Sequence, residues 1–153
     1  MEWVLLAYRM PREPSSPRIA VWRKLRRLGV AQIVDGLVTL PFDARTKEQL
    51  EWIADEIGEA GGEATLWLGR LGSARHEREL AARMADAITG EYRAIIDAAR
   101  VAHDETDAGR RRVLARLRRE LRRIARRDYF PPPERDAARA AVSKLAALAV
   151  VDA

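Results

Sequence analysis

Residues 15–41 read SSPRIAVWRKLRRLGVAQIVDGLVTLP, and this stretch predicts an amphipathic helix followed by a two-stranded hairpin. Large apolar side chains recur in its first half at intervals of three and four residues, at Ile19, Trp22, Leu25 and Leu28, with Val21 beside them. This spacing puts them on one face of a helix, because side chains three and four residues apart are neighbours on a helix surface. Ser15 or Ser16 is suited to cap the N-terminus, and Pro17 suits the first turn.

The polar side of this helix is basic, and its far end has a stop signal. The basic residues are Arg23, Arg26 and Arg27. Gly29 predicts a left-handed residue that ends the helix. The apolar runs at residues 30–34 and 37–42 have the length of strands. Asp35-Gly36 between them predicts a type I′ turn, which needs a positive φ at both residues.

The elements on either side of this unit complete a domain of mixed class. Residues 3–8 and 64–68 are apolar runs of strand length. Thr46 and Gln49 have the spacing of a capping box, and the helix that it would start ends at Gly61-Gly62. We therefore expect an α+β, ferredoxin-like βαββαβ sandwich over residues 1–70. Its expected core is Val4, Leu6, Trp22, Leu25, Leu28, Ile33, Val38, Leu40, Ile53, Ile57, Leu66 and Leu68.

Residues 71–153 show only helical patterns. Apolar stripes predict helices at about 74–100, 109–127 and 135–150, with breaks at a polar segment and at Tyr129-Phe130-Pro131. We expect this second domain to be a basic helical hairpin package that packs on the first.

Composition limits the classes of protein to which the chain can belong. No apolar run approaches the roughly 20 residues that span a bilayer, and there is no cysteine, so we expect a cytoplasmic protein without a membrane partner. The net charge of +5 is uneven: residues 1–69 hold 9 Lys and Arg against 10 Asp and Glu, whereas residues 70–153 hold 19 against 13. This asymmetry favours a polyanion as partner of the second half.

Residues that could support catalysis are few. The two histidines, His76 and His103, have neither a His-Glu-x-x-His spacing nor a neighbouring cysteine. Four acids at helical spacing are better explained as the solvated face of a helix than as a metal site; they are Glu48, Glu51, Asp55 and Glu59. No phosphate-binding glycine loop or nucleophile elbow is present. We therefore predict no cofactor, no metal and no enzymatic activity.

The segment GRRRVLARLRRELRRIARR, residues 109–127, carries the strongest functional signal. Its apolar stripe is narrow, and nearly every other position is arginine: Arg110, Arg111, Arg112, Arg116, Arg118, Arg119, Arg122, Arg123, Arg126 and Arg127. Arginine's planar fork suits phosphate, so we predict that this helix, assisted by Arg23, Arg26 and Arg27, binds the DNA backbone. A solvated helix face remains the simpler alternative, and a membrane-surface helix is disfavoured because the stripe lacks Trp and Phe.

Residues 3–41 also resemble a known family. The opening WVLLAYRMP, the segment SSPRIAVWRKLRRLG and the Asp35-Gly36 hairpin that ends in Leu40-Pro41 resemble the N-terminal domain of the ChrB chromate-resistance regulators. The opening is also similar to the ferredoxin-like part of PaaX-type repressors and, more remotely, to the Cas2 nucleases of CRISPR systems. The resemblance implies a bacterial DNA-binding regulator of a chromate-efflux operon that is relieved by chromate.

The chain departs from these families in two ways, and each departure limits what the resemblance implies. ChrB regulators carry a further C-terminal domain thought to sense chromate, whereas this chain stops at Ala153, so we expect a DNA-binding part without a separate sensor domain. Cas2-type nucleases place a metal-binding aspartate where this chain has Tyr8-Arg9, so nuclease activity is not carried over. A protein-interaction or oligomerisation module is the alternative function, followed by a metal-dependent nuclease. Symmetric dimers are the commonest assembly, so a homodimer is expected.

Overall fold

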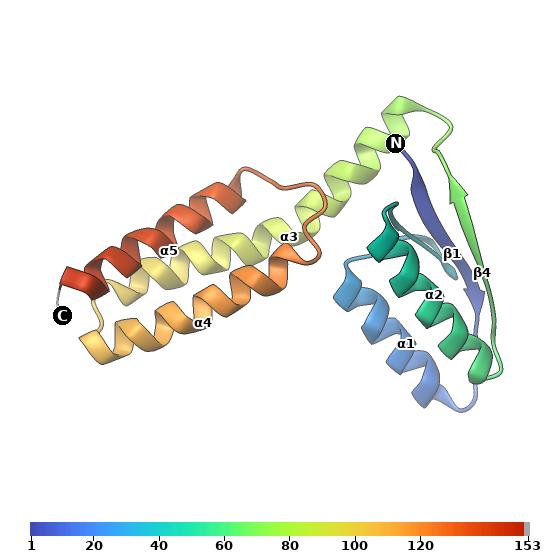
Figure 1. The fold of residues 1–153 in the computed structure, drawn as a ribbon, viewed down its shortest axis with the longest axis horizontal. Helices are drawn as coiled ribbons and strands as arrows, with labels where there is room; N and C mark the ends of the chain where they lie inside the picture. The colour runs from blue at the N-terminus through green and yellow to red at the C-terminus, as the bar shows by residue number, and fades with distance from the viewer. Residues whose placement is uncertain (152–153) are drawn as a thin grey trace. The chain divides into compact units, whose positions relative to one another are not determined.

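The computed structural model describes residues 1–151, and the side chains of residues 1–149. The chain forms two compact units, Met1–Leu80 and Ala81–Ala153. Within the described residues there are four strands and five helices (Figure 1). They are, in order, β1 Trp3–Arg9, α1 Ser15–Leu28, β2 Ala31–Val34, β3 Leu37–Pro41, α2 Ala44–Glu59, β4 Glu63–Gly69, α3 Ala74–Ala102, α4 Asp107–Ala125 and α5 Glu134–Val151.

The strands form one antiparallel sheet in the order β2-β3-β1-β4. The central strand β1 aligns Val4 with Leu40 of β3 on one side and with Leu68 of β4 on the other. The predicted α+β class is therefore confirmed, whereas the ferredoxin-like name for this arrangement stays a prediction. The predicted boundary after residue 70 also stays a prediction, and the compact units divide ten residues later, inside α3.

Helices α1 and α2 cover one face of the sheet (Figure 1). Five side chains of these helices are buried: Val21, Leu25, Leu50, Ile53 and Ile57. They pack with Val4, Leu6, Val38 and Leu40, because residues two apart on a strand share a face. The expected core was wrong at Ile33 and Leu68, which are exposed on the two edge strands, and Trp22, Leu28 and Leu66 are half-buried.

Trp3 anchors the start of α3 to this unit. Its side chain is 1% exposed, and its indole Nε1 donates a hydrogen bond to Glu77 Oε1 at 2.9 Å. A buried indole N–H needs such an acceptor. The first turns of α3 therefore belong to the sheet unit, although they continue into a helix of 29 residues.

The hairpin between β2 and β3 has a different turn from the one predicted. Gly36 has a φ of 77°, but no residue other than glycine has a positive φ in the described chain, so Asp35 cannot form a type I′ turn. The loop keeps two residues, because Val34 pairs with Leu37, and the register of β2 shifts before it, between Gln32 and Val34. Gly36 O also accepts a hydrogen bond from Tyr8 N at 2.8 Å, which ties the turn to the end of β1.

Both predicted N-terminal caps in this unit were wrong. The N-cap of α1 is Pro14, and neither Ser15 nor Ser16 makes a cap hydrogen bond, although Pro17 does lie in the first turn. Thr46 is not the N-cap of α2 but its third residue: Asp43 Oδ1 accepts from Thr46 N at 2.7 Å, and Thr46 Oγ1 accepts from Asp43 N at 3.0 Å. The predicted stop at Gly29 is confirmed, with a φ of 80°.

In the second unit the C-terminal part of α3 packs with α4 and α5 around one apolar core. The core members are Ile88, Tyr92, Ile95, Ala99, Ala102, Leu114, Leu117, Ile124, Ala138, Val142 and Leu145. The three predicted helices are confirmed, and the proline-rich segment after α4 separates α4 from α5. None of the helices among the described residues is both long enough and apolar enough to cross a membrane.

Candidate nucleic-acid interface

Helix α4 turns its arginines outward because its apolar stripe is buried in the second unit. Leu114, Leu117 and Ile124 are at most 7% exposed. The helix begins where Thr106 Oγ1 accepts a hydrogen bond from Gly109 N at 3.1 Å, and Asp107 places an acid in the first turn, where the helix dipole favours it. Its start and rotation are thus fixed by an N-cap and by the core.

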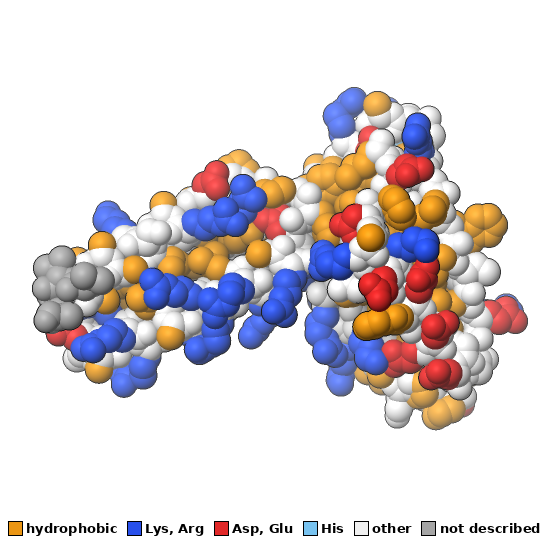
Figure 2. Space-filling model, viewed as in Figure 1, with side chains coloured by type: hydrophobic (Ala, Val, Ile, Leu, Met, Phe, Trp, Pro, Cys, Tyr) orange, Lys and Arg blue, Asp and Glu red, His pale blue; other side chains and the backbone are white. Residues whose placement is uncertain are grey.

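Eight of the predicted arginines of this segment are exposed. Figure 2 shows Lys and Arg side chains gathered along α4 on the visible face. The exposed members are Arg111, Arg112, Arg116, Arg118, Arg119, Arg122, Arg123 and Arg126. The other two predicted residues, Arg110 and Arg127, are half-buried and bind groups within the protein.

Arg110 binds the turn that joins α3 to α4. Its Nη1 donates to His103 O at 3.1 Å and to Glu105 O at 2.8 Å, and its Nη2 forms an ion pair with Asp107. The side chain is 14% exposed. These contacts satisfy carbonyl groups that follow the end of α3, so we assign Arg110 a structural role.

Two consecutive residues of α3, Glu91 and Tyr92, bind two consecutive residues just after the end of α4. Arg127 makes a bidentate ion pair with Glu91, in which Nη2 lies 2.6 Å from Oε1. The Tyr92 hydroxyl donates to Asp128 Oδ2 at 2.5 Å. The hydrogen bonds that Arg127 donates to Glu91 raise the pKa of Arg127, and burial followed by the bond to Asp128 raises the pKa of Tyr92. Both pairs fix the C-terminal end of α4.

Replacing Arg127 by Ala is expected to lower the free energy of unfolding by about 1–2 kcal/mol, because it leaves a partly buried Glu91 carboxylate without its donor. The matched change Arg123→Ala, at an exposed position, is expected to stay within about 0.5 kcal/mol of the parent. Urea denaturation followed by far-UV circular dichroism measures both. Equal stability of the two variants would show that the Glu91 pair contributes nothing.

Five of the exposed α4 arginines make neither an ion pair nor a hydrogen bond with any residue from 1 to 149. Arg116 lies 3.7 Å from Glu120, and Arg111 Nε donates to Asp107 O. Within residues 1–149, no ion pair forms at Arg112, Arg118, Arg119, Arg122 or Arg123. Like charges at this density repel one another, and an anion such as phosphate relieves that repulsion. The geometry therefore provides a cationic face on α4, a helix about 28 Å long at 1.5 Å per residue over 19 residues.

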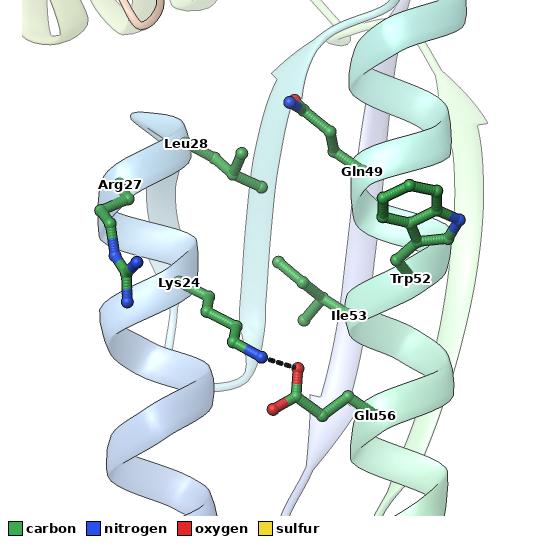
Figure 3. A pocket seen from close by; sticks show the side chains of 7 residues that line it. All are labelled: Lys24, Arg27, Leu28, Gln49, Trp52, Ile53 and Glu56. Carbon is green, nitrogen blue, oxygen red and sulfur yellow. Dashed lines mark hydrogen bonds and ion pairs between the residues drawn. The ribbon is translucent and has the colours of Figure 1, made fainter. Parts of the chain in front are cut away.

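The three predicted arginines of the first unit lie exposed on α1, and the α4 set belongs to the second unit. Arg27 lines a groove of about 360 Å³ between α1 and α2 (Figure 3). Lys24, beside it, is paired with Glu56 at 2.7 Å, whereas Arg27 has no acid partner within residues 1–149. Arg27 is therefore the cation that this groove offers to a ligand.

Sequence reasoning missed Trp52, which forms one wall of this groove and is 67% exposed (Figure 3). A signal was present, because Trp52 stands one residue before Ile53 and so falls outside the buried stripe of Leu50, Ile53 and Ile57. An aromatic residue on the polar side of a helix is worth examining as a binding residue. Here it supplies a flat apolar surface on the α2 side of the groove, across from Arg27 of α1 (Figure 3).

The remaining candidate residues do not form a catalytic arrangement in the part of the chain that the structure describes. His76 is exposed near the start of α3, and His103 is half-buried just after it. Lys47 pairs with Glu51 at 2.5 Å along α2. Among residues 1–149, no group of three or more His, Asp and Glu side chains could hold a metal ion.

Two comparisons with known proteins agree with each other. A family described as "Protein ChrB, N-terminal" matches residues 18–108. Protein ChrB of Cupriavidus metallidurans is 27% identical over 143 residues, an alignment that covers 84% of this chain and 40% of that protein. The chain thus spans about two fifths of the length of the curated relative that it matches. Since the family match extends over more than half of the 153 residues, the chain belongs to the ChrB N-terminal family.

Proposed function

We propose that this chain is a DNA-binding part of a chromate-resistance transcriptional regulator, and that α4 binds the phosphate backbone. The observation that carries the proposal is the set of five exposed α4 arginines that make no ion pair or hydrogen bond within residues 1–149. Membership of the ChrB N-terminal family supports the regulatory role. The family match ends at residue 108, before these arginines, so the role of α4 rests on its geometry and charge.

The charge of each unit supports the choice of surface. The first unit is balanced, with 12 Lys and Arg against 12 Asp and Glu, whereas the second unit holds 16 against 11. The whole excess of positive charge therefore belongs to the three-helix unit. The length of α4, about 28 Å, matches roughly eight base pairs of duplex at 3.4 Å each. Phosphate contacts of this kind fix position and orientation, while base-edge contacts are needed for sequence preference.

The proposal also includes three expectations from the sequence analysis, on the fold, the cellular location and the effect of chromate. The order β2-β3-β1-β4, with α1 and α2 on one face, supports a ferredoxin-like fold for residues 1–70, followed by a basic helical region from residue 71. A bacterial transcriptional regulator meets its operator in the cytoplasm. Release of DNA by chromate, which the family resemblance implies, belongs to the complete regulator.

Duplex DNA binding across a salt series tests the proposal. The five unpaired arginines predict a slope of log K against log salt of about −4 or steeper, at 0.9 per phosphate contact. Fluorescence anisotropy with a labelled operator-length duplex measures it. A chain that does not bind at about 0.1 M salt, or that binds with a slope near zero, would refute the proposal. Size-exclusion chromatography with and without DNA then distinguishes DNA binding from the alternative function, a protein-interaction or oligomerisation module.

A further inference from the structure

The two edges of the sheet differ in how well they are protected against pairing with another strand. β2 has only four residues and a register shift between Gln32 and Val34. β4 has seven residues, contains no proline and keeps an unbroken register with β1 from Glu63 to Gly69. Short length and irregularity are devices that block edge-to-edge association, and β4 has neither. Its outer backbone groups pair with no other strand of the described chain.

Apolar surface flanks this open edge on both faces of the sheet. Trp67 is 60% exposed and Leu68 is 51% exposed, and successive residues of a strand point to opposite faces. Trp67 Nε1 already donates to Thr65 Oγ1 at 3.0 Å, so the polar atom of the indole is satisfied within the strand. The exposed surface that remains is largely apolar, which is costly next to an unpaired edge.

The charges at the two ends of β4 are complementary to a second, antiparallel copy of the same strand. Glu63 begins the strand and Arg70 follows its last residue. If Leu66 lies on a two-fold axis, all seven residues pair, and Glu63 faces Gly69 of the second copy, one residue from its Arg70. Arg70 has no ion-pair partner within residues 1–149, and Glu63 is 80% exposed where it pairs with Arg9.

We propose that β4 is a dimer interface, at which two copies of this chain pair antiparallel about Leu66 and join their sheets into one of eight strands. In this register Trp67 packs beside Thr65 of the second copy, because directly opposed residues share a face. The interface is isologous, as a two-fold axis requires. An edge pairing buries less than the roughly 800 Å² per partner of a standard interface, so the dimer dissociates in the micromolar range.

This inference goes beyond the proposed function and does not depend on it. A two-fold dimer carries two α4 helices, which favours DNA with two related half-sites. Dimerisation itself is measured without DNA, so loss of the β4 interface and loss of DNA binding have separate readouts.

Sedimentation velocity over a concentration series tests the interface. The parent chain is expected to convert from monomer to dimer as its concentration rises. Trp67→Lys is expected to weaken the dimer at least about tenfold, because it removes apolar contact and sets two like charges near each other at the edge. Val34→Lys, at a 59% exposed position of β2, is the matched control and is expected to leave the dimer unchanged.

Exchanging the charges of Glu63 and Arg70 tests the proposed register of the two β4 strands. Glu63→Arg and Arg70→Glu are each expected to weaken dimerisation, and the double variant is expected to restore most of it, because the antiparallel pairing again joins opposite charges. Circular dichroism of each variant confirms that the sheet unit is folded. A parent chain that stays monomeric at the highest concentration would overturn the proposal. A dimer that survives Trp67→Lys, or that Val34→Lys disrupts instead, would do the same.

Discussion

A variant with glutamine at four exposed arginines of α4 is expected to bind duplex DNA roughly 100- to 1,000-fold more weakly than the parent at about 0.1 M salt. The four positions are Arg118, Arg119, Arg122 and Arg123. None of them has an acid partner within residues 1–149, so each is free to neutralise a phosphate. Loss of four contacts also makes the salt slope shallower by about 3.6, at 0.9 per phosphate.

A variant of equal charge separates a local interface from a general effect of net charge. It places glutamine at four exposed basic positions on α3 and α5: Arg75, Arg78, Arg100 and Lys144. Both variants lower the net charge by four, and glutamine is a good helix former, so both are expected to keep the helical circular dichroism signal of the parent. Only the α4 variant should lose most of the salt dependence. Equal losses in the two variants would refute α4 as the binding surface.

The local signals of the sequence located the elements well but did not locate the caps. The predicted end of α1 at Gly29 depended on only one residue in a left-handed conformation, and this prediction is confirmed. At α2 only Thr46 was predicted as the cap, although Asp43 stands three residues before it and is also a good N-cap residue. Thr46 Oγ1 also donates to Pro41 O at 2.7 Å. That contact to the end of β3 places Thr46 inside the first turn and leaves the cap to Asp43.

The errors in the expected core have a tertiary cause. Periodicity identified the apolar side of α1 but not its centre, which is at Val21 and Leu25, with Ile19 45% exposed. The sheet edges could not be read from the sequence either, because apolar alternation looks the same in a central strand and in an edge strand. Leu68 shares its face with Val4, yet it lies on the last strand and is 51% exposed.

The candidate interface was predicted as one set of arginines. In the structure the members of that set differ in their exposure and in their contacts. Arg127 is held by Glu91, which lies 36 residues earlier on a neighbouring helix. Arg110 binds carbonyl groups of a turn whose path the sequence does not specify. Such partners are set by how the helices pack, so composition alone could not identify these two residues as structural.

Replacing Gly36 by Ala is expected to lower the free energy of unfolding of the sheet unit by about 2–4 kcal/mol. Gly36 has a φ of 77°, and an added Cβ would lie 2.5 Å from the backbone oxygen of Tyr8. That oxygen cannot move aside, because Tyr8 N is hydrogen-bonded to Gly36 O at 2.8 Å and β1 is the central strand of the sheet. The change therefore strains the turn and separates it from β1.

Gly58→Ala is the matched control and is expected to act in the opposite direction. Gly58 lies within α2, and an added Cβ would meet nothing within 4 Å, so alanine should raise the free energy of unfolding by about 0.5–1 kcal/mol. All four tryptophans lie within residues 1–80, so tryptophan fluorescence during urea denaturation reports on the sheet unit alone. The two midpoints should move apart, Gly36→Ala to lower urea and Gly58→Ala to higher. A Gly36→Ala midpoint equal to that of the parent would contradict the close approach of this turn to Tyr8, because a backbone oxygen at 2.5 Å leaves no room for a methyl group.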